Sequence, residues 1–268
     1  MRDSFARRNE TVIHPTAIVD PGARIPESCR IGPYCVIGAE VEMGEECELI
    51  SHVVVHGPTR MGRNNRIFPF AAIGVEPQDI SYAGEPTRLE MGDYNVVREC
   101  VTLNRGTVKG GGVTRIGSHV LIMAYAHVGH DTVIGDHAML VNAATLAGHV
   151  IVEEWAVVGA LCPVHQFVRI GAHSYIGGGT VITQDVLPFS KTSATRENRA
   201  YGLNSVGLKR RGFSDERIKK LHHAYRVLLA ARLNTSQAIE KLRSEGDLGE
   251  DVELLIRFVE SSERGVIK

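Results

Sequence analysis

An aliphatic residue recurs at every sixth position over most of this chain. The run has no polar exception over residues 13–73, resumes over residues 91–103, and continues unbroken over residues 116–182. A period of six matches neither the 3.6-residue α-helix nor the two-residue alternation of an ordinary strand. A six-residue unit of one short strand and one corner, repeated without slack, predicts a parallel β-helix in which equivalent positions stack in columns.

Two further columns of the repeat agree with this fold. Counting the aliphatic residue as position one, position two is often glycine, which suits a corner that needs a positive φ or a close approach. Position five is almost always small or β-branched, and we expect this column to face inward. Asn65 and Asn95 depart from that rule, and the repeat offers no reason for them. The glycines at position two are Gly32, Gly38, Gly44, Gly62, Gly92, Gly117, Gly135 and Gly171.

Two interruptions of the register predict loops that leave the coil. They span residues 74–90 and 105–115. Insertions in a repeat protein collect on one face and commonly carry the binding chemistry. We therefore expect a β-helix over residues 1–190, with a candidate binding site near these two loops.

The composition changes after the last repeat. Residues 191–268 predict a crossing segment followed by a small C-terminal helical domain. Ser214 is a good N-cap because two acidic residues and an apolar stripe at helical spacing follow it. Two further helices are expected, around residues 238–243 and 252–259. The stripe after Ser214 consists of Ile218, Leu221, Tyr225 and Leu228.

Composition excludes several classes of protein. The 268 residues are 43% hydrophobic and carry a formal charge of −1, so no basic surface for nucleic acid is indicated. Neither a signal peptide nor an apolar run long enough for a membrane span is present, so we expect a cytoplasmic protein without a transmembrane segment. The cysteines lack the CxxC spacing typical of zinc sites and indicate neither disulfides nor a structural metal.

The segment 126–131 concentrates two histidines and a carboxylate. His130 followed by Asp131 is a plausible general base, because the carboxylate can orient the imidazole and stabilise its protonated form. A histidine beside an aspartate on a solvated turn is nevertheless common, so the pair alone is weak evidence.

The repeat strengthens this hypothesis. If three units form one coil, each residue lies over the residue 18 positions later. Gly148 and then Gln166 would stack over His130, while His149 would stack over Asp131. His127 and His165 would lie beside these columns. Four histidines, a carboxylate and a free backbone N–H would thus gather within about two coils, which favours a functional site.

Several motifs resemble those of the UDP-N-acetylglucosamine O-acyltransferase family. They include the segments 82–88, 146–149, 165–167 and 207–213, and the match extends over nearly the whole chain. This resemblance implies that the coil is a left-handed parallel β-helix, although ordinary parallel crossovers are right-handed. It also implies a homotrimer with active sites in the clefts between subunits.

The activity implied by the resemblance is acyl transfer. A 3-hydroxyacyl chain would move from acyl carrier protein to the glucosamine 3-hydroxyl of UDP-N-acetylglucosamine, the first step of lipid A biosynthesis. His130 would act as general base, Asp131 would support it, and the backbone N–H of Gly148 would stabilise the oxyanion. No metal or other cofactor is implied, since the phosphopantetheine thioester of the carrier is a co-substrate and the sugar hydroxyl attacks it directly.

The resemblance also implies substrate-binding positions. Arg211, with its neighbour Arg210, would suit phosphate groups and an acidic carrier protein, because guanidinium groups bind phosphate in bidentate fashion. Gly178 matches the position that sets acyl length, where a glycine leaves room for a long chain. The other positions are Gln78 and Asp79 for the sugar and nucleotide, His127, His149, His165 and Gln166 for the substrate, and Asn204 and Arg210 for the UDP part.

Two departures from the family pattern leave alternatives open. Ser81 stands where the family has a lysine and Val206 where it has a glutamate, so each change removes a charge from the substrate region. N-acylation of a 3-amino UDP-sugar is therefore a second possibility. A γ-type carbonic anhydrase would use a zinc ion bound by three histidines, but it requires neither the two loops nor the helical domain. The candidate ligands for that zinc ion are His127, His130 and His149. A non-enzymatic scaffold is the third alternative.

Overall fold

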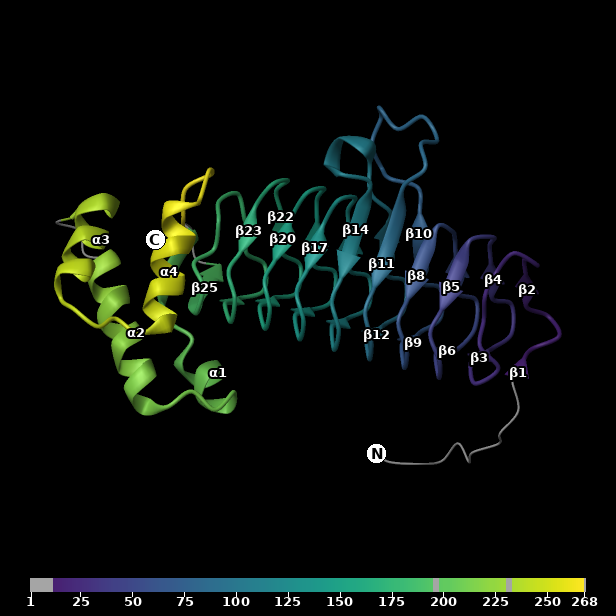
Figure 1. Ribbon diagram of the computed structural model, residues 1–268, viewed down its shortest axis with the longest axis horizontal. Helices are drawn as coiled ribbons and strands as arrows, with labels where there is room; N and C mark the ends of the chain where they lie inside the picture. The colour runs from purple at the N-terminus through teal and green to yellow at the C-terminus, as the bar shows by residue number, and fades with distance from the viewer. Residues whose placement is uncertain (1–11, 195–197, 230–232, 268) are drawn as a thin grey trace.

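The computed structural model describes residues 12–194, 198–229 and 233–267 as an elongated coil of short strands with helices at its C-terminal end (Figure 1). Strands from successive coils pair in parallel to form three sheets. The 11-stranded sheet contains β1 (Val12–Ile13), β3 (Arg30–Ile31), β6 (Glu48–Leu49), β9 (Arg66–Ile67), β12 (Val96–Val97), β15 (Leu121–Ile122), β18 (Met139–Leu140), β21 (Val157–Val158), β24 (Tyr175–Ile176), β25 (Ser190–Ala194) and β26 (Asn198–Leu203).

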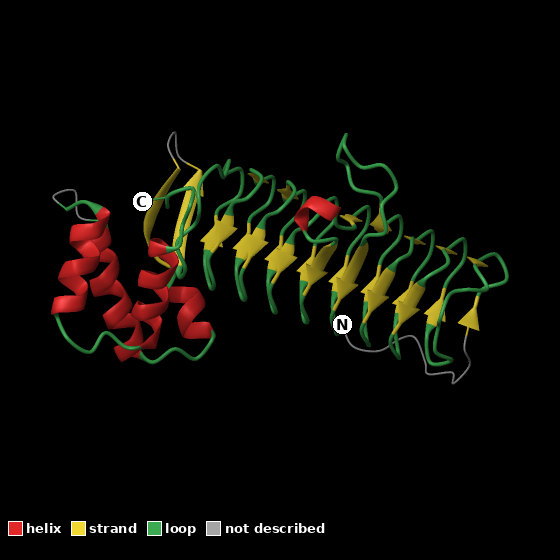
Figure 2. Cartoon of the chain, turned by 45° about the horizontal axis from the view of Figure 1, so that its top comes forward, coloured by secondary structure: helices red, strands yellow, loops and turns green. Residues whose placement is uncertain are grey.

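The other two sheets complete the triangular coil. The 8-stranded sheet contains β2 (Ile18–Val19), β4 (Val36–Ile37), β7 (Val54–Val55), β10 (Ala72–Val75), β13 (Thr102–Asn104), β16 (His127–Val128), β19 (Thr145–Leu146) and β22 (Pro163–Val164). The 7-stranded sheet contains β5 (Val41–Met43), β8 (Thr59–Met61), β11 (Arg88–Met91), β14 (Val113–Ile116), β17 (Val133–Ile134), β20 (Ile151–Val152) and β23 (Arg169–Ile170). Figure 2 shows these strands stacked in rows along the axis of the coil.

The predicted 18-residue stacking is confirmed. His127 pairs with Thr145, and Thr145 pairs with Pro163. From Ile31 onward the six-residue aliphatic column is buried, whereas Ile13 remains 41% exposed because it lies in the first coil. The core therefore runs along the axis of the coil.

The left-handed corner lies at a different position from the one that the glycines suggested. Positive φ falls at position four, at residues such as Tyr34 (φ 58°) and Asp131 (φ 59°), and not at the glycines of position two. Close approach requires a glycine at every one of those positions except Gly38; a Cβ on Gly32, for example, would lie 1.8 Å from the carbonyl oxygen of Ile50 in the next coil.

The two asparagines at position five form a ladder inside the coil. The Asn65 Nδ2 donates to the carbonyl oxygens of Gly62 (2.8 Å) and Gly92 (2.9 Å), while its Oδ1 accepts from the Asn95 backbone N–H (2.9 Å). Asn95 repeats the pattern one coil further along. Both side chains are buried and hydrogen-bonded through both ends, so they are tolerated in an otherwise apolar column.

Both interruptions of the repeat project from the same part of the coil (Figure 1). They are shorter than their sequence ranges, because β10, β11 and β14 extend into them. The second loop contains the short 3₁₀ helix η1 (Val108–Gly110). Arg105 joins the two loops, since its Nη2 donates to the Tyr82 hydroxyl at 2.9 Å and its guanidinium lies 5.5 Å from that ring centre.

The C-terminal helices are α1 (Ser205–Arg210), α2 (Asp215–Leu228), α3 (Thr235–Ser244) and α4 (Glu250–Glu260). Ser214 caps α2 as predicted, and the apolar stripe of α2 is buried against the other helices. The short α1 and the antiparallel β25–β26 pair were not predicted. Helix α1 contains a glycine and a β-branched residue, which are poor helix formers, and it owes its start to the cap at Asn204. Within the described ranges, no helix is long and apolar enough to cross a membrane.

Candidate active site

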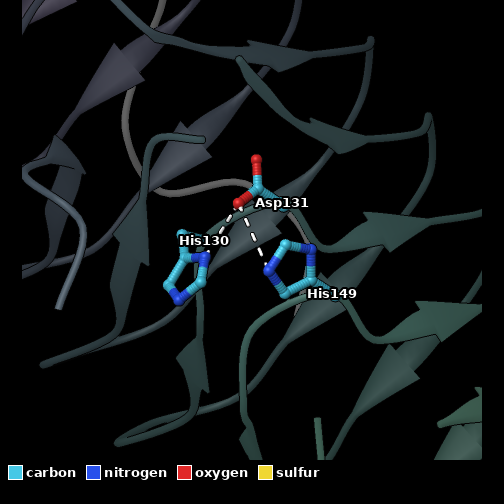
Figure 3. Close-up of side chains that lie close together, drawn as sticks. All are labelled: His130, Asp131 and His149. Atoms are coloured by element: carbon cyan, nitrogen blue, oxygen red, sulfur yellow. Dashed lines mark hydrogen bonds and ion pairs between the residues drawn. The ribbon is translucent and has the colours of Figure 1, made fainter. Parts of the chain in front are cut away.

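The histidine–carboxylate pair lies at the corner between β16 and β17. The His130 Nδ1 and the Asp131 Oδ2 are 2.8 Å apart, and the two side chains meet as Figure 3 shows. The Asp131 side chain is only 1% exposed, whereas that of His130 is 16% exposed. A buried carboxylate thus orients an imidazole that still reaches solvent.

The second loop holds the Asp131 carboxylate in place. The Thr107 backbone N–H donates to Oδ1 at 2.8 Å, and the Thr107 hydroxyl donates to Oδ2 at 2.6 Å. Gly110 packs so closely that a Cβ there would lie 2.0 Å from the Asp131 Cγ. Sequence reasoning missed Thr107 as a supporting residue. The N–H and the hydroxyl of Thr107 thus hold both carboxylate oxygens in place.

This network assigns the tautomer of His130. An ionised carboxylate at Nδ1 is an acceptor only, so the ring donates its Nδ1–H to Asp131. Nε2 then keeps its lone pair and can accept a proton from a substrate hydroxyl. The pair can therefore act as an oriented general base.

The residues 18 positions later lie over the pair as predicted. A Cβ on Gly148 would lie 2.5 Å from the His130 Cε1 and 2.6 Å from its Nε2, so only glycine leaves room for this ring. The backbone N–H of Gly148 has no acceptor among the described residues. At the equivalent corner of another coil the Ser118 N–H donates to the Asp136 Oδ1 at 2.7 Å, whereas the N–H of Gly148 is free beside the base and can donate to an oxyanion.

His149 completes the cluster over Asp131. Its Nε2 lies 3.8 Å from the Asp131 Oδ2, its ring meets that of His130 edge-on with centres 5.0 Å apart, and it stacks on Phe167 at 4.4 Å. Partial burial lowers the pKa of His149, although the charge of Asp131 acts in the opposite direction. His149 is thereby kept largely neutral at pH 7 and able to hydrogen-bond a substrate.

His127 lies in β16, on the outer face of the 8-stranded sheet. Its Nδ1 and the Thr102 hydroxyl are 2.7 Å apart, and burial, with a smaller contribution from His130, lowers its pKa. Among the described residues, the atoms that could together hold a metal ion belong to His130, Asp131 and His149 and lie within 4.8 Å of one another. His127 is not part of that group, so the three-histidine zinc set is not assembled within one chain.

Asp79, one of the two contacts predicted from the first loop, lies near the catalytic pair. Hydrogen bonds from the Ser81 backbone and hydroxyl lower the pKa of Asp79, and the charges of Lys109 and His130 lower it further. Asp79 is therefore an ionised neighbour of the catalytic pair. Gln78, His165 and Gln166 are exposed, and Gly178 is exposed near Ala160.

Two of the predicted contacts near the C-terminus, Asn204 and Arg211, have other partners in this chain. Asn204 caps α1, where its Oδ1 accepts from the Gly207 N–H at 3.2 Å and its Nδ2 donates to the His173 carbonyl at 3.1 Å. The Arg211 guanidinium lies 5.3 Å from the Trp155 ring centre, whereas Arg210 is exposed. Asn204 is the N-cap of α1, Arg210 its last residue and Arg211 its C-cap, and none of them belongs to the cluster around His130. Figure 1 shows α1 at the C-terminal end of the coil.

Below pH 6.5, the stability of the fold is expected to depend on His173. Burial, reinforced by the Arg211 charge, lowers the pKa of this histidine to about 4, so its contribution is present above pH 6.5 and is lost as pH falls toward 4. Between pH 7.5 and 5 the wild type should lose about 2 kcal/mol more unfolding free energy than His173→Phe. Phe189 already adopts the same left-handed backbone (φ 64°). Urea unfolding of both proteins at the two pH values measures these losses. An equal loss of unfolding free energy in the two proteins would contradict this expectation.

Comparison with known proteins decides the family. The family model described as "Udp N-acetylglucosamine O-acyltransferase; Domain 2" matches residues 185–267, and the model of bacterial transferase hexapeptides matches residues 114–148. The acyl-[acyl-carrier-protein]–UDP-N-acetylglucosamine O-acyltransferase of Alkalilimnicola ehrlichii is 50% identical over 74% of this chain and 77% of its own. This chain belongs to the UDP-N-acetylglucosamine O-acyltransferase family.

Solved structures of the family agree. The UDP-N-acetylglucosamine acyltransferase of Francisella novicida matches with a TM-score of 0.92 and 39% identity, covering 95% of this chain and 93% of that chain. The family member from Acinetobacter baumannii matches with a TM-score of 0.91 and 42% identity, covering 95% and 99%. The chain therefore has the left-handed parallel β-helix of this acyltransferase family, as predicted.

Proposed function

We propose that this protein transfers a 3-hydroxyacyl chain from acyl carrier protein to the glucosamine 3-hydroxyl of UDP-N-acetylglucosamine, the first step of lipid A biosynthesis. The observation that carries the proposal is the oriented base His130 with the free N–H of Gly148 beside it, in a chain whose relatives bear the name of this activity. A base and an oxyanion donor on either side of one reacting centre are what direct acyl transfer requires.

The mechanism follows from the geometry of the pair. The His130 Nε2 takes the proton of the sugar hydroxyl as its oxygen attacks the thioester carbonyl, and Asp131 stabilises the resulting imidazolium. The Gly148 N–H donates to the oxyanion of the tetrahedral intermediate. When that intermediate collapses, the C–S bond breaks and the imidazolium returns a proton to the departing thiolate. The products are the acylated sugar and the free thiol of the carrier.

The thioester is supplied by the phosphopantetheine of the carrier protein, so no further cofactor enters the chemistry. Asn204 and Arg210 begin and end α1 and lie outside the cluster around His130, and a homotrimer would allow a neighbouring subunit to bring such residues to the site. We expect this assembly to work in the cytoplasm.

A transfer assay with purified protein tests the proposal. Defined 3-hydroxyacyl carrier proteins are offered with UDP-N-acetylglucosamine or with its 3-amino analogue, and the products are identified by mass spectrometry. Ester formation on the 3-hydroxyl sugar is expected. Transfer to the amino sugar alone would replace O-acylation by N-acylation, and the absence of transfer to either acceptor would overturn the proposal. Measuring bound zinc in the same sample tests the carbonic anhydrase alternative.

A further inference from the structure

The two loops contain one cation without an ionic partner. Their four basic side chains are Arg88, Arg105, Lys109 and Arg115. Arg88 and Arg115 pair with Glu90 at 2.6 and 3.3 Å, and Arg105 pairs with Glu76 at 3.5 Å. Lys109, on the exposed surface of η1, has no carboxylate oxygen within 4.0 Å among the described residues. The structure thus leaves the charge of Lys109 available to a ligand.

The ammonium group of Lys109 nevertheless has a defined place. Its Nζ donates to the Ser81 hydroxyl at 2.7 Å, and that hydroxyl lies 2.9 Å from both carboxylate oxygens of Asp79. The Ser81 backbone N–H also donates to Asp79 at 2.9 Å. One of three ammonium donors is used to join the loops, which leaves two for another acceptor.

This ammonium lies at the edge of the catalytic site. Thr107, the N-cap of η1, and Gly110, its last residue, both contact the Asp131 carboxylate. Asp79, bonded to the serine that Lys109 contacts, is within electrostatic range of both Lys109 and His130. A buried carboxylate, Asp131, and a solvent-facing one, Asp79, therefore both lie near the base. Without a cation, their charges would oppose any substrate that carries a phosphate.

We propose that Lys109 is a substrate-binding residue that contacts a phosphate group, with Ser81 as the positioning residue that holds its ammonium in place. This inference rests on the proposed function, in which both substrates carry phosphate: the nucleotide sugar as a diphosphate and the carrier as a phosphodiester. Ser81 stands at the position where the family has a lysine. Because the Lys109 ammonium contacts the Ser81 hydroxyl, Lys109 would supply a positive charge in the same region. The substitution at Ser81 does not leave the site without a cation.

Charge removal at Lys109 tests the inference. We expect Lys109→Gln to raise the KM of one substrate about tenfold, as the loss of a charge-assisted hydrogen bond would, with little change in kcat. A rise for the nucleotide sugar assigns the contact to the diphosphate, and a rise for the acyl carrier protein assigns it to the phosphodiester. Lys109→Arg should retain most of the binding. Lys219→Gln, on the exposed surface of α2, is the matched control and should change neither KM.

A double variant separates charge from loop structure. Ser81→Lys combined with Lys109→Gln moves the ammonium to the other loop, and we expect it to recover most of the lost affinity. A double variant as weak as Lys109→Gln, or a Lys109→Gln enzyme with both KM values within twofold of wild type, would overturn the inference.

Direct binding keeps the inference separate from the proposed function. If the wild type transfers no acyl group, calorimetry with UDP-N-acetylglucosamine and with phosphopantetheine compares its Kd values with those of Lys109→Gln. A Kd about tenfold weaker for either ligand supports the assignment of Lys109 even then, and unchanged Kd values contradict it. Thermal unfolding of each variant checks that the loops remain folded.

Discussion

Replacing His130 by alanine is expected to lower kcat of acyl transfer by about 10²–10⁴-fold, because the base that is hydrogen-bonded to Asp131 is lost. The KM values should change far less, since the imidazole acts on a proton and contributes little to the binding of either large substrate. The variant should unfold at nearly the wild-type temperature, because the side chain lies at the surface of the coil. Steady-state kinetics and thermal unfolding of the same preparation measure both effects.

His56→Ala is the matched control for this experiment. His56 is an exposed histidine of the same coil whose side chain makes no hydrogen bond to the described residues. Its loss should leave the rate unchanged. A His130→Ala enzyme that kept full acyl transfer would remove the general-base role and restore the possibility of a non-enzymatic scaffold.

Adding one methyl group at Gly148 is expected to reduce kcat about 10²-fold while the fold is retained. The backbone of Gly148 is not in the left-handed region, so alanine is not strained there. Its Cβ would, however, lie about 2.5 Å from the His130 ring and must displace it. A shift of about 1 Å in a catalytic group is enough for a loss of this size.

Gly38→Ala controls for the effect of a methyl group on the coil itself. Gly38 occupies position two of the repeat, and a Cβ there would meet its nearest neighbour, the Val55 carbonyl oxygen, at an ordinary 3.6 Å. This variant should keep both its activity and its unfolding temperature. Full activity in Gly148→Ala would show that catalysis does not depend on the observed position of the His130 ring.

Stacking within the coil could be predicted from the sequence because it is a property of a local period. When the same residue types recur every six positions and three units form one coil, each residue pairs with the residue 18 positions later. That count placed Gly148 beside His130 and His149 beside Asp131, as found. The fold and the centre of the candidate site were therefore both predictable.

Contacts made by inserted segments were not predictable in this way. Loops have no period, so nothing in the residue pattern says that Thr107 holds the Asp131 carboxylate or that Lys109 reaches Ser81 across two loops. The same holds for Arg211, whose charge suggested a phosphate contact while packing placed its guanidinium over Trp155. Each of these contacts depends on how two distant segments close against each other.

The Asn65–Asn95 ladder lies between these cases. The repeat places both residues in an inward column, but their hydrogen bonds to the turns of neighbouring coils depend on how the coils stack in space. Periodicity determines which side chains share a column and hence the position of the catalytic pair. The supporting loops, the ionisation of the groups around the base and the free charge of Lys109 are decided by through-space contacts, because hydrogen bonds and burial depend on distance and not on sequence separation.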